Sequence, residues 1–286
     1  MNPPQQSNVA WWSANPMTYD WEKHIQAQEG SLEFFQESDR RALEAHRPFG
    51  HPAYPDEPAY SRLIPWPEVR DKRVLEIGCG MGLHASLHSA AGAKITTIDL
   101  TWRAVHTARR RFNLGNQRVN TLRTDGEKLP FRDNSFDRVW SWGVIHHSSN
   151  TAALVREIHR VLKPGGLFQF MVYHRHSVRY WIIGGVQHGI LHGKLLRMNL
   201  EQVNQTFTDG AIARHYTAGE MPALLQGFTQ PRCRILQETG SDAMPKISPL
   251  LRRLAPDFSR RFDQWVNDRW GWFLFVETNK EADSPA

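Results

Sequence analysis

The sequence has few cysteines, no long uninterrupted apolar run and no internal repeat. Its 286 residues include only Cys79 and Cys233, which argues against a disulfide framework and favours a reducing, cytoplasmic compartment. The longest apolar stretch, residues 180–191, is broken by glycine, glutamine and histidine, so it falls short of the ~20 residues of a membrane span. The amino terminus lacks the basic start and apolar core of a signal peptide. The length suits one large domain, or a domain with a substantial insertion.

The sequence has an excess of positive charge, but its basic residues are dispersed along the chain. The formal net charge is +6, which fits a nucleic acid, an anionic membrane or an anionic substrate as partner. The tightest basic run, residues 109–111, falls on a predicted helix and has no aromatic residues among its arginines. A solvated helix face is the favoured interpretation, and nucleic acid is not an expected partner.

The chain from residue 73 onward alternates between strand and helix patterns. This alternation predicts an α/β fold with a parallel sheet covered by helices on both faces. Residues 174–227 read as mainly helical, and 241–267 as irregular or helical. The predicted strands are 73–77, 94–98, 119–123, 136–142, 167–173, 232–237 and 272–277, and the predicted helices among them are 82–91, 102–112 and 151–162.

The stretch VLEIGCGMGLHASL places three glycines between the first strand and the helix that follows it. Gly78 and Gly80 permit a sharp turn and a close approach of backbone N–H groups to a ligand, and Gly82 permits close helix packing. The Gly-x-Gly-x-Gly spacing is shorter than the dinucleotide pattern Gly-x-Gly-x-x-Gly. Asp99 ends the next strand, where a carboxylate can accept both hydroxyls of a ribose. A helix N-cap is the alternative role for Asp99.

Four motifs in order carry a family resemblance. VLEIGCGMG, TTIDL, RTDGEKLPFRDNSFDRVWSWGVIHH and LVREIHRVLKPGG, across roughly residues 73–173, resemble the class I S-adenosylmethionine-dependent methyltransferases, in the small-molecule branch of the type 11 kind. The resemblance implies a Rossmann-like, doubly wound seven-stranded sheet whose last strand, 272–277, is antiparallel. It also implies a methyltransferase domain at 73–286, with insertions at about 174–229 and 241–269, behind an N-terminal cap at 1–72.

The resemblance assigns cofactor-binding roles at matching positions. Glu76 and the backbone of Gly78, Cys79 and Gly80 would hold the methionine end of the cofactor. Asp99 would bind the ribose, and Leu100, Asp125 and Gly126 would contact the adenine. Ser141 and Trp142 would flank the sulfonium. A packing role is favoured for the Cys79 side chain over a nucleophilic one. The cofactor carries a sulfonium cation and no pyrophosphate, which suits carboxylates and aromatic faces rather than a long phosphate-binding loop.

Histidines at the ends of predicted strands point to the acceptor side of the reaction. A hydroxyl acceptor needs a base, and histidine is the usual one near pH 7. His147 and His174 are the candidate bases, and Tyr173 could orient the acceptor or abut the sulfonium. His146 is a candidate for acceptor contact, with a structural role for the His146–His147 pair as the alternative. Oxygen is the preferred acceptor atom, and nitrogen and carbon stay open.

Two further segments depart from the sheet pattern. Residues 173–199 combine apolar side chains with Arg175, Arg179, Lys194 and Arg197, and would form a lid over an acceptor with an apolar part and an anionic group. A helical cap packed on the core is the alternative. The cluster of Arg214, His215 and Tyr216 could close over the same site.

The N-terminal WWSANPMTYDW is rich in aromatic side chains that are costly to expose. We expect it to fold over the mouth of the site, with Tyr19 or Trp21 near the cofactor, excluding water and aligning the acceptor. Simple packing against the sheet edge is the alternative.

Three other functions remain open at this point. A nucleic-acid methyltransferase is disfavoured because SWGV stands where amino-methylating DNA enzymes carry Asn/Asp-Pro-Pro-aromatic. A non-catalytic protein that keeps the cofactor as a ligand stays open, whereas loss of the cofactor is disfavoured by the intact set of Gly78, Gly80, Asp99 and Asp125. An NAD oxidoreductase is disfavoured by the short glycine spacing and by Asp125. His84 and His88 have the spacing of helical zinc ligands, but no third ligand is evident nearby, so no metal is expected. The sequence makes no prediction about oligomeric state.

Overall fold

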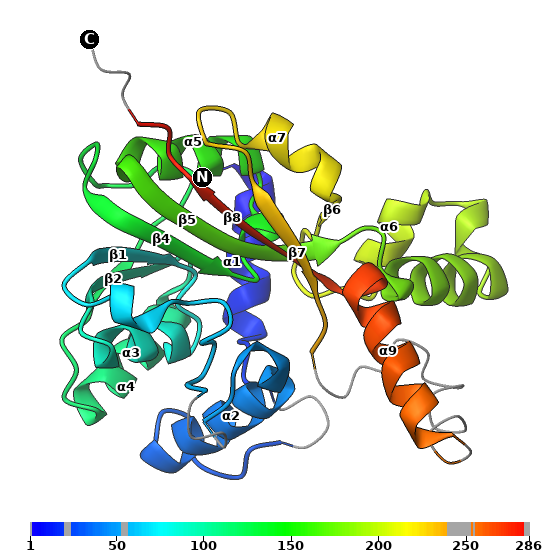
Figure 1. Ribbon diagram of the computed structural model, residues 1–286, viewed down its shortest axis with the longest axis horizontal. Helices are drawn as coiled ribbons and strands as arrows, with labels where there is room; N and C mark the ends of the chain where they lie inside the picture. Colours follow the sequence, from blue (N-terminus) through cyan, green and yellow to red (C-terminus); the bar gives the residue numbers. More distant parts are fainter. Residues whose placement is uncertain (1, 20–23, 53–56, 239–252, 254, 283–286) are drawn as a thin grey trace.

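A β-sheet of seven strands in continuous order, with one short additional strand, forms the centre of the molecule (Figure 1). The computed structural model describes residues 2–19, 24–52, 57–238, 253 and 255–282. The sheet order is β3-β2-β1-β4-β5-β8-β7, and β6 pairs with β5 outside this path. The strands are β1 (Arg73–Ile77), β2 (Lys94–Asp99), β3 (Asn120–Arg123), β4 (Phe136–Trp142), β5 (Leu162–His174), β6 (His215–Tyr216), β7 (Arg232–Leu236) and β8 (Phe273–Asn279).

The sheet is parallel except at one strand, as the resemblance implies. β8 runs antiparallel to both β5 and β7, and the predicted Rossmann-like fold class is confirmed. Two details were not predicted. β5 begins at Leu162, five residues early, because Leu162 pairs with Phe136 before a register shift in the ladder. β6 is two residues long and lies within the segment expected to be mainly helical.

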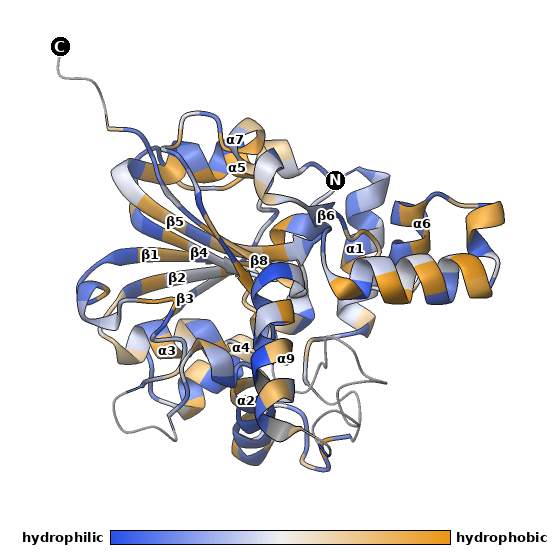
Figure 2. Ribbon diagram, turned by 45° about the vertical axis from the view of Figure 1, so that its right-hand side comes forward, coloured by the Kyte–Doolittle hydropathy of each residue, from blue (hydrophilic) through white to orange (hydrophobic). Residues whose placement is uncertain are grey.

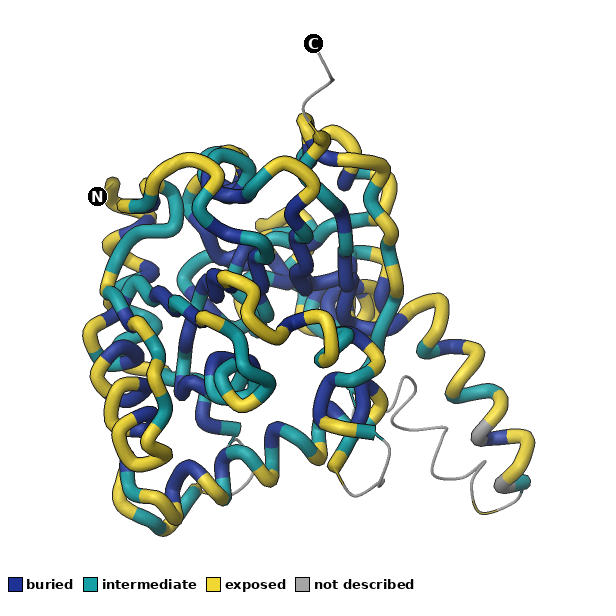
Figure 3. The backbone as a smooth tube through the Cα atoms, turned by 60° about the vertical axis from the view of Figure 1, so that its left-hand side comes forward, coloured by how far each residue is buried: buried dark blue, intermediate teal, exposed yellow. Residues whose placement is uncertain are grey.

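Helices cover both faces of the sheet. α3 (Leu83–Ala90) and α4 (Trp102–Leu114) pack on one face, and α5 (Thr151–Val161) and α7 (Met221–Leu224) pack on the other. Strand residues divide between these layers because successive side chains point to opposite faces: Val74 packs toward α3 and α4, whereas Leu75 and Ile77 pack toward α5. Buried residues accordingly concentrate at the sheet (Figure 3).

The N-terminal segment forms α1 (Pro3–Ala14) and α2 (Leu32–Ala45), joined to β1 through the 3-10 turns Arg47–Phe49 and Trp66–Glu68. Asn2 caps α1 by accepting from the Gln5 N–H, and Ser31 caps α2 by accepting from the Phe34 N–H. Trp21 lies outside the described residues. The division into a cap at 1–72 and a domain at 73–286 stays a prediction.

A helical projection follows β5. It consists of the π-helix η4 (Arg179–Leu191), the 3-10 turn η5 (Lys194–Leu196) and α6 (Leu200–Gln205), with a further 3-10 turn at Ala218–Glu220 before α7. The second predicted insertion contains α9 (Pro256–Trp270), and part of it lies outside the described residues. Within the described ranges, no helix combines the length and hydropathy that spanning a membrane requires.

Candidate active site

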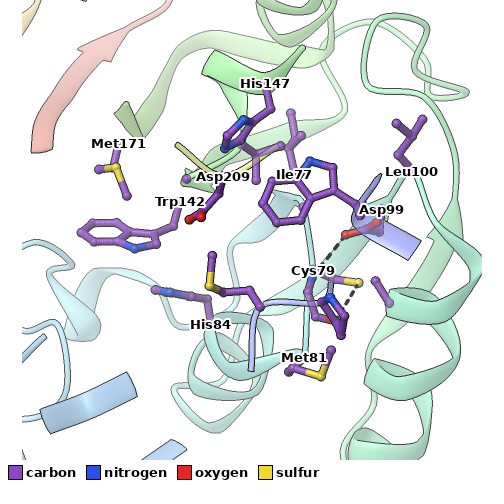
Figure 4. Close-up of a pocket in the computed structure, with 18 of the residues that line it drawn as sticks. Ile77, Cys79, Met81, His84, Asp99, Leu100, Trp142, His147, Met171 and Asp209 are labelled. Atoms are coloured by element: carbon purple, nitrogen blue, oxygen red, sulfur yellow. Dashed lines mark hydrogen bonds between the residues drawn. The ribbon is translucent and has the colours of Figure 1, made fainter. Parts of the chain in front are cut away.

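A cavity of about 520 Å³ opens at the carboxyl ends of the parallel strands. Its wall is made by the loops that follow β1, β2, β3 and β4, by the end of β5, and by the N-terminal segment. This is the edge at which doubly wound sheets bind ligands. Figure 4 shows side chains from these separate loops pointing into one space. Of the residues predicted from the sequence, the wall includes Tyr19, Gly78, Cys79, Gly80, Asp99, Leu100, Asp125, Gly126, Trp142, His147, Tyr173 and Arg179.

The bend after β1 is held by bonds within the protein. The N–H groups of Gly78 and Cys79 both donate to the Ile98 carbonyl oxygen over 2.9 Å, so these two donors are satisfied without a ligand. The bend instead offers room, because apart from the adjoining residues of the chain no heavy atom lies within 4 Å of the position that a Cβ on Gly80 would occupy. Burial holds the pKa of the Cys79 thiol well above its usual range, which suits packing rather than nucleophilic attack.

The other two glycines are set by close packing. A Cβ on Gly78 would lie 2.2 Å from Val144 Cγ2, and one on Gly82 would lie 2.9 Å from the Phe112 ring. Both glycines also have positive φ, 86° and 82°, which other residues rarely adopt. The predicted packing role of Gly82 therefore matches its contact with α4.

Asp99 is not the N-cap of the helix that follows it. Thr101 caps α4 by accepting from the Ala104 N–H. Asp99 accepts instead from the Thr101 N–H at 2.9 Å, from the Thr101 hydroxyl at 3.0 Å and from the Gly80 N–H at 3.3 Å. Burial raises the pKa of this carboxyl, and these hydrogen bonds oppose the rise. They also fix the carboxylate on the cavity wall beside the glycine bend.

Asp125 and Gly126 form the wall after β3. Asp125 Oδ1 accepts from the Glu127 N–H at 3.0 Å and from Gln5 Nε2, on α1, at 2.8 Å. A Cβ on Gly126 would lie 2.7 Å from Leu154 Cδ1 on α5, so glycine is needed for this close approach.

The N-terminal segment closes over the same region. Asn8 Nδ2 donates to the His147 carbonyl oxygen at 2.7 Å, and the Trp12 ring meets the His147 ring edge-on at 5.0 Å. Tyr19 also lines the cavity, and burial raises the pKa of its hydroxyl. Asn8, Trp12 and Tyr19 therefore border the cavity, and the role of the N-terminal segment as a cap over the site stays a prediction.

The compartment beyond the glycine bend is aromatic. Trp142 lies within ring-contact distance of His46 (5.3 Å), His84 (5.8 Å) and Phe273 (6.0 Å), and Met171 completes this part of the wall. Burial lowers the pKa of His46 to about 3 and that of His84 well below its usual range. Both rings are therefore neutral near pH 7 and act as aromatic surface.

Two carboxyl groups that the sequence did not single out face this compartment. Asp209 follows α6 and Glu238 follows β7, and both line the cavity together with Tyr173 and Arg179; Figure 4 shows Asp209 pointing inward beside Trp142 and His147. Burial raises the pKa of Asp209 against the opposing effects of Arg179 and Tyr173. Burial likewise raises the pKa of Glu238 to about 7, opposed by Arg179. Neither residue belongs to a motif, so sequence reasoning had no signal for them.

Of the two candidate bases, His147 and His174, the fold brings only His147 to the cavity wall. Its Nδ1 lies 2.6 Å from the Ile212 carbonyl oxygen, which can only accept, so Nδ1 carries the proton and Nε2 keeps a lone pair. Burial lowers the pKa of His147 to about 4. The side chain is a neutral imidazole near pH 7.

The structure does not bring four other predicted residues to the cavity. Glu76 is buried beneath the bend, accepts from the Thr97 hydroxyl and has its pKa raised to about 8 by burial. The Ser141 hydroxyl donates to the Ile77 carbonyl oxygen at 3.2 Å. His174 Nδ1 lies 3.1 Å from the Gly271 carbonyl oxygen. His146 is fully buried with its ring 4.0 Å from that of Tyr173.

The remaining predicted acceptor contacts hold the chain around β6 in place. Arg175 pairs with Glu220 at 2.8 Å, and the Arg214 guanidinium donates to the Ser149 carbonyl oxygen at 3.1 Å. The Tyr216 hydroxyl donates to Thr151 Oγ1 at 3.0 Å. These three side chains do not line the cavity. The described part of the chain also contains no cluster of three or more potential metal ligands.

Part of the cavity wall lies in a segment that is similar to known proteins. Residues 75–170 match the family model described as a methyltransferase domain. Two curated relatives are the malonyl-[acyl-carrier protein] O-methyltransferase of Erwinia pyrifoliae, 39% identical over 99 residues, and the fatty-acid O-methyltransferase of Mycolicibacterium smegmatis, 35% identical over 105 residues. The alignments cover 34% and 36% of this chain, and 36% and 38% of those proteins. Each alignment thus spans little more than a third of this chain and of the relative.

The fold as a whole resembles solved structures. The S-adenosylmethionine-dependent methyltransferase from Mesorhizobium loti superposes with a TM-score of 0.52 at 21% identity, covering 77% of this chain and 96% of that one. At this identity the likeness concerns the fold. The family resemblance stated from the four sequence motifs is confirmed by the domain match.

Proposed function

We propose that the protein binds S-adenosyl-L-methionine and moves its methyl group to a small-molecule acceptor. The match of residues 75–170 to the methyltransferase-domain family model supports this proposal. One observation carries the proposal: the glycine bend, Asp99 and Asp125 open onto the same cavity as the aromatic compartment around Trp142. A cofactor held by the first group would direct its sulfonium toward the second.

The residues on the wall fit the cofactor without a metal or a phosphate site. Asp99 would accept from the ribose hydroxyls and Asp125 from the adenine amino group, while Gly80 leaves room for the nucleoside beside the bend. The aromatic faces of Trp142 and Tyr173 would stabilise a cation beside them. When bound, the cofactor supplies an electrophilic methyl group on sulfur. We assign cofactor contacts to these residues rather than to Glu76 and Ser141, which do not reach the cavity.

Methyl transfer to oxygen requires a group that takes the acceptor proton. The acceptor oxygen forms the new bond to the methyl carbon as the carbon–sulfur bond breaks, and the electron pair of that bond stays on sulfur. We assign the released proton to Asp209, because a buried carboxylate with a raised pKa is a better base than an ordinary one. His147 Nε2 is the second candidate, since it has a lone pair but a pKa of about 4.

The acceptor proposed here is small and partly apolar. Two similar proteins are named as O-methyltransferases of malonyl-[acyl-carrier protein] and of fatty acids, which supports an oxygen acceptor attached to an apolar chain. The cavity offers little for an anionic group: of the predicted basic contacts only Arg179 reaches it, and Arg179 shares that wall with Asp209 and Glu238. A cytoplasmic location is part of the same proposal, based on the low cysteine content.

Titration calorimetry tests the cofactor half of the proposal. S-adenosyl-L-methionine should bind with one site per chain, and a nicotinamide dinucleotide should not bind; the reverse would overturn the assignment. Incubation with trideuteromethyl cofactor and fractionated small metabolites, followed by mass spectrometry, then tests transfer. Binding without any labelled product would favour a non-catalytic binder. In a parallel incubation with total RNA and DNA in place of the metabolites, labelled nucleic acid would favour a nucleic-acid substrate.

A further inference from the structure

The helical projection after β5 exposes an unusual amount of apolar surface. The side chains of Leu196, Leu191 and Ile190 are 89%, 74% and 65% exposed. Figure 2 shows this projection as a predominantly hydrophobic arm beside α6. We define the apolar arm as the exposed hydrophobic residues of 181–198, namely Trp181, Ile182, Val186, Ile190, Leu191, Leu195, Leu196 and Met198.

The packing of η4 forces these side chains outward. Its glycines form the face that meets α6, where a Cβ on Gly184 would lie 2.3 Å from Asn204 Oδ1. A Cβ on Gly189 would lie 2.8 Å from Leu195 Cδ1. Because the glycine face is the buried one, the larger apolar residues of η4 must occupy the opposite face. This differs from both sequence interpretations, since the segment neither closes over the cavity with its apolar residues nor packs them on the core.

Within the sequence range of the apolar arm the formal charges have one sign, and the nearest acidic residue on α6, Glu201, accepts a hydrogen bond from the Tyr180 hydroxyl of η4. Residues 179–198 contain Arg179, Lys194 and Arg197 and no aspartate or glutamate. Arg197 is exposed, and Lys194 donates to the Thr206 hydroxyl at the edge of the arm. Basic side chains bordering exposed leucine, isoleucine and tryptophan match an anionic lipid surface, in which the apolar groups enter the acyl boundary and the cations meet phosphates.

We propose that the apolar arm binds the surface of an anionic lipid bilayer. A second copy of this chain fits less well, because a symmetric contact would bring the same basic residues face to face. A pocket on a rigid partner also fits less well, since the leucines project from a turn and a helix end instead of lining a groove. Arg179 begins η4 and also lines the cavity, so the bilayer would lie near the acceptor compartment. That last consequence for the acceptor rests on the proposed function, whereas lipid binding does not.

Vesicle sedimentation tests the proposal with the full chain. The wild-type protein should sediment with phosphatidylcholine vesicles containing phosphatidylglycerol and remain in the supernatant with phosphatidylcholine alone. The double variant Leu191→Glu/Leu196→Glu should lose this binding. Lys194→Gln/Arg197→Gln should weaken it by about 30-fold, since each basic residue near an anionic surface contributes roughly a factor of five.

The double variant Leu32→Glu/Leu114→Glu is the matched control. Leu32 and Leu114 are each 52% exposed, at the start of α2 and the end of α4. Figure 1 shows these two helices away from α6 and the projection beside it, so the replacements add the same two negative charges outside the apolar arm. It should sediment like the wild type. Unchanged melting temperatures and cofactor affinities would show that the variants are folded.

Two results would overturn the proposal. One is wild-type protein that ignores anionic vesicles. The other is light scattering that shows a dimer which Leu191→Glu/Leu196→Glu converts to monomer, because a second copy would then occupy the arm. Neither result bears on cofactor binding, so the proposed function would stand.

Discussion

Gln5 Nε2 donates a hydrogen bond to Asp125 Oδ1 over 2.8 Å, joining the N-terminal helix to the loop after β3. Asp125 is the carboxylate that we assign to the adenine amino group. A side-chain amide and an exocyclic amino group present the same kind of donor. Gln5 therefore already donates to the carboxylate that the adenine amino group would use. When the cofactor binds, either α1 shifts away or Asp125 accepts from both donors.

Gln5→Ala should tighten cofactor binding by about 2- to 10-fold. The hydrogen bond from Gln5 to Asp125, with a net contribution of about 0.5–1.5 kcal/mol, no longer has to be broken when the cofactor binds. Titration calorimetry with S-adenosyl-L-methionine measures the change. Ser7→Ala, on the exposed side of the same helix, should leave the affinity unaltered. Weaker binding by Gln5→Ala would mean that Gln5 helps to hold the bound cofactor.

Asp99→Ala should reduce cofactor affinity at least tenfold while the protein stays folded. Hydrogen bonds to a charged group contribute about 1.5–3 kcal/mol each, and the two ribose hydroxyls would lose theirs. Calorimetry gives the affinity, and circular dichroism checks the fold. Asp268→Ala removes an exposed carboxylate on α9 and serves as the control. Undiminished affinity in Asp99→Ala would count against the ribose assignment.

Gly80→Ala and Gly78→Ala should separate binding from folding. A methyl on Gly80 meets no neighbour but keeps a φ of 47°, so it should cost about 1–2 kcal/mol of stability and obstruct the cofactor. A methyl on Gly78 would run into Val144 at 2.2 Å and should cost about 2–5 kcal/mol. Chemical denaturation and calorimetry on both variants check this. Normal affinity in Gly80→Ala would show that the cofactor does not use the open space.

The pH dependence of stability should report the buried Glu76. Burial raises its pKa to about 8 in the folded protein, from 4.5 in the unfolded chain. Between pH 4.5 and 8 the folded state binds more protons than the unfolded chain. The contribution of Glu76 to the free energy of unfolding is therefore fully present below pH 4.5 and is lost as the pH rises toward 8, by at most about 1.4 kcal/mol per pH unit. Glu76→Gln should show a flatter profile in denaturant melts at pH 5, 6.5 and 8. A parallel profile would mean that Glu76 does not titrate in this range.

Asp209→Asn and His147→Ala should differ in turnover once an acceptor is known. If Asp209 takes the proton, Asp209→Asn lowers kcat strongly and abolishes the rise of kcat/KM with pH through the raised pKa of that carboxyl. His147→Ala would then keep the same pH profile with a smaller loss. The opposite pattern would return the role to His147. Cofactor affinity should be similar in both variants.

The sequence alone determined the parts of the site that depend on local pattern. Strand β4 (Phe136–Trp142) matches its predicted bounds, and β8 is reversed as the resemblance implies. Gly78, Gly80, Asp99 and Asp125 reach one cavity because parallel strands end at one sheet edge. The local sequence around the end of each strand was therefore enough to predict that these four residues lie at the site.

Only the tertiary structure decided which distant side chains join them. Gln5 meets Asp125 across 120 residues, and Asp209 and Glu238 enter from irregular segments that no periodicity describes. The same holds for the apolar arm: the sequence predicted a lid or a cap for this segment, and only the buried glycine face of η4 shows that its large apolar residues are exposed. The periodicity of a sequence indicates which face of a helix or strand is apolar. Which other element buries that face depends on contacts between segments that are far apart in the chain.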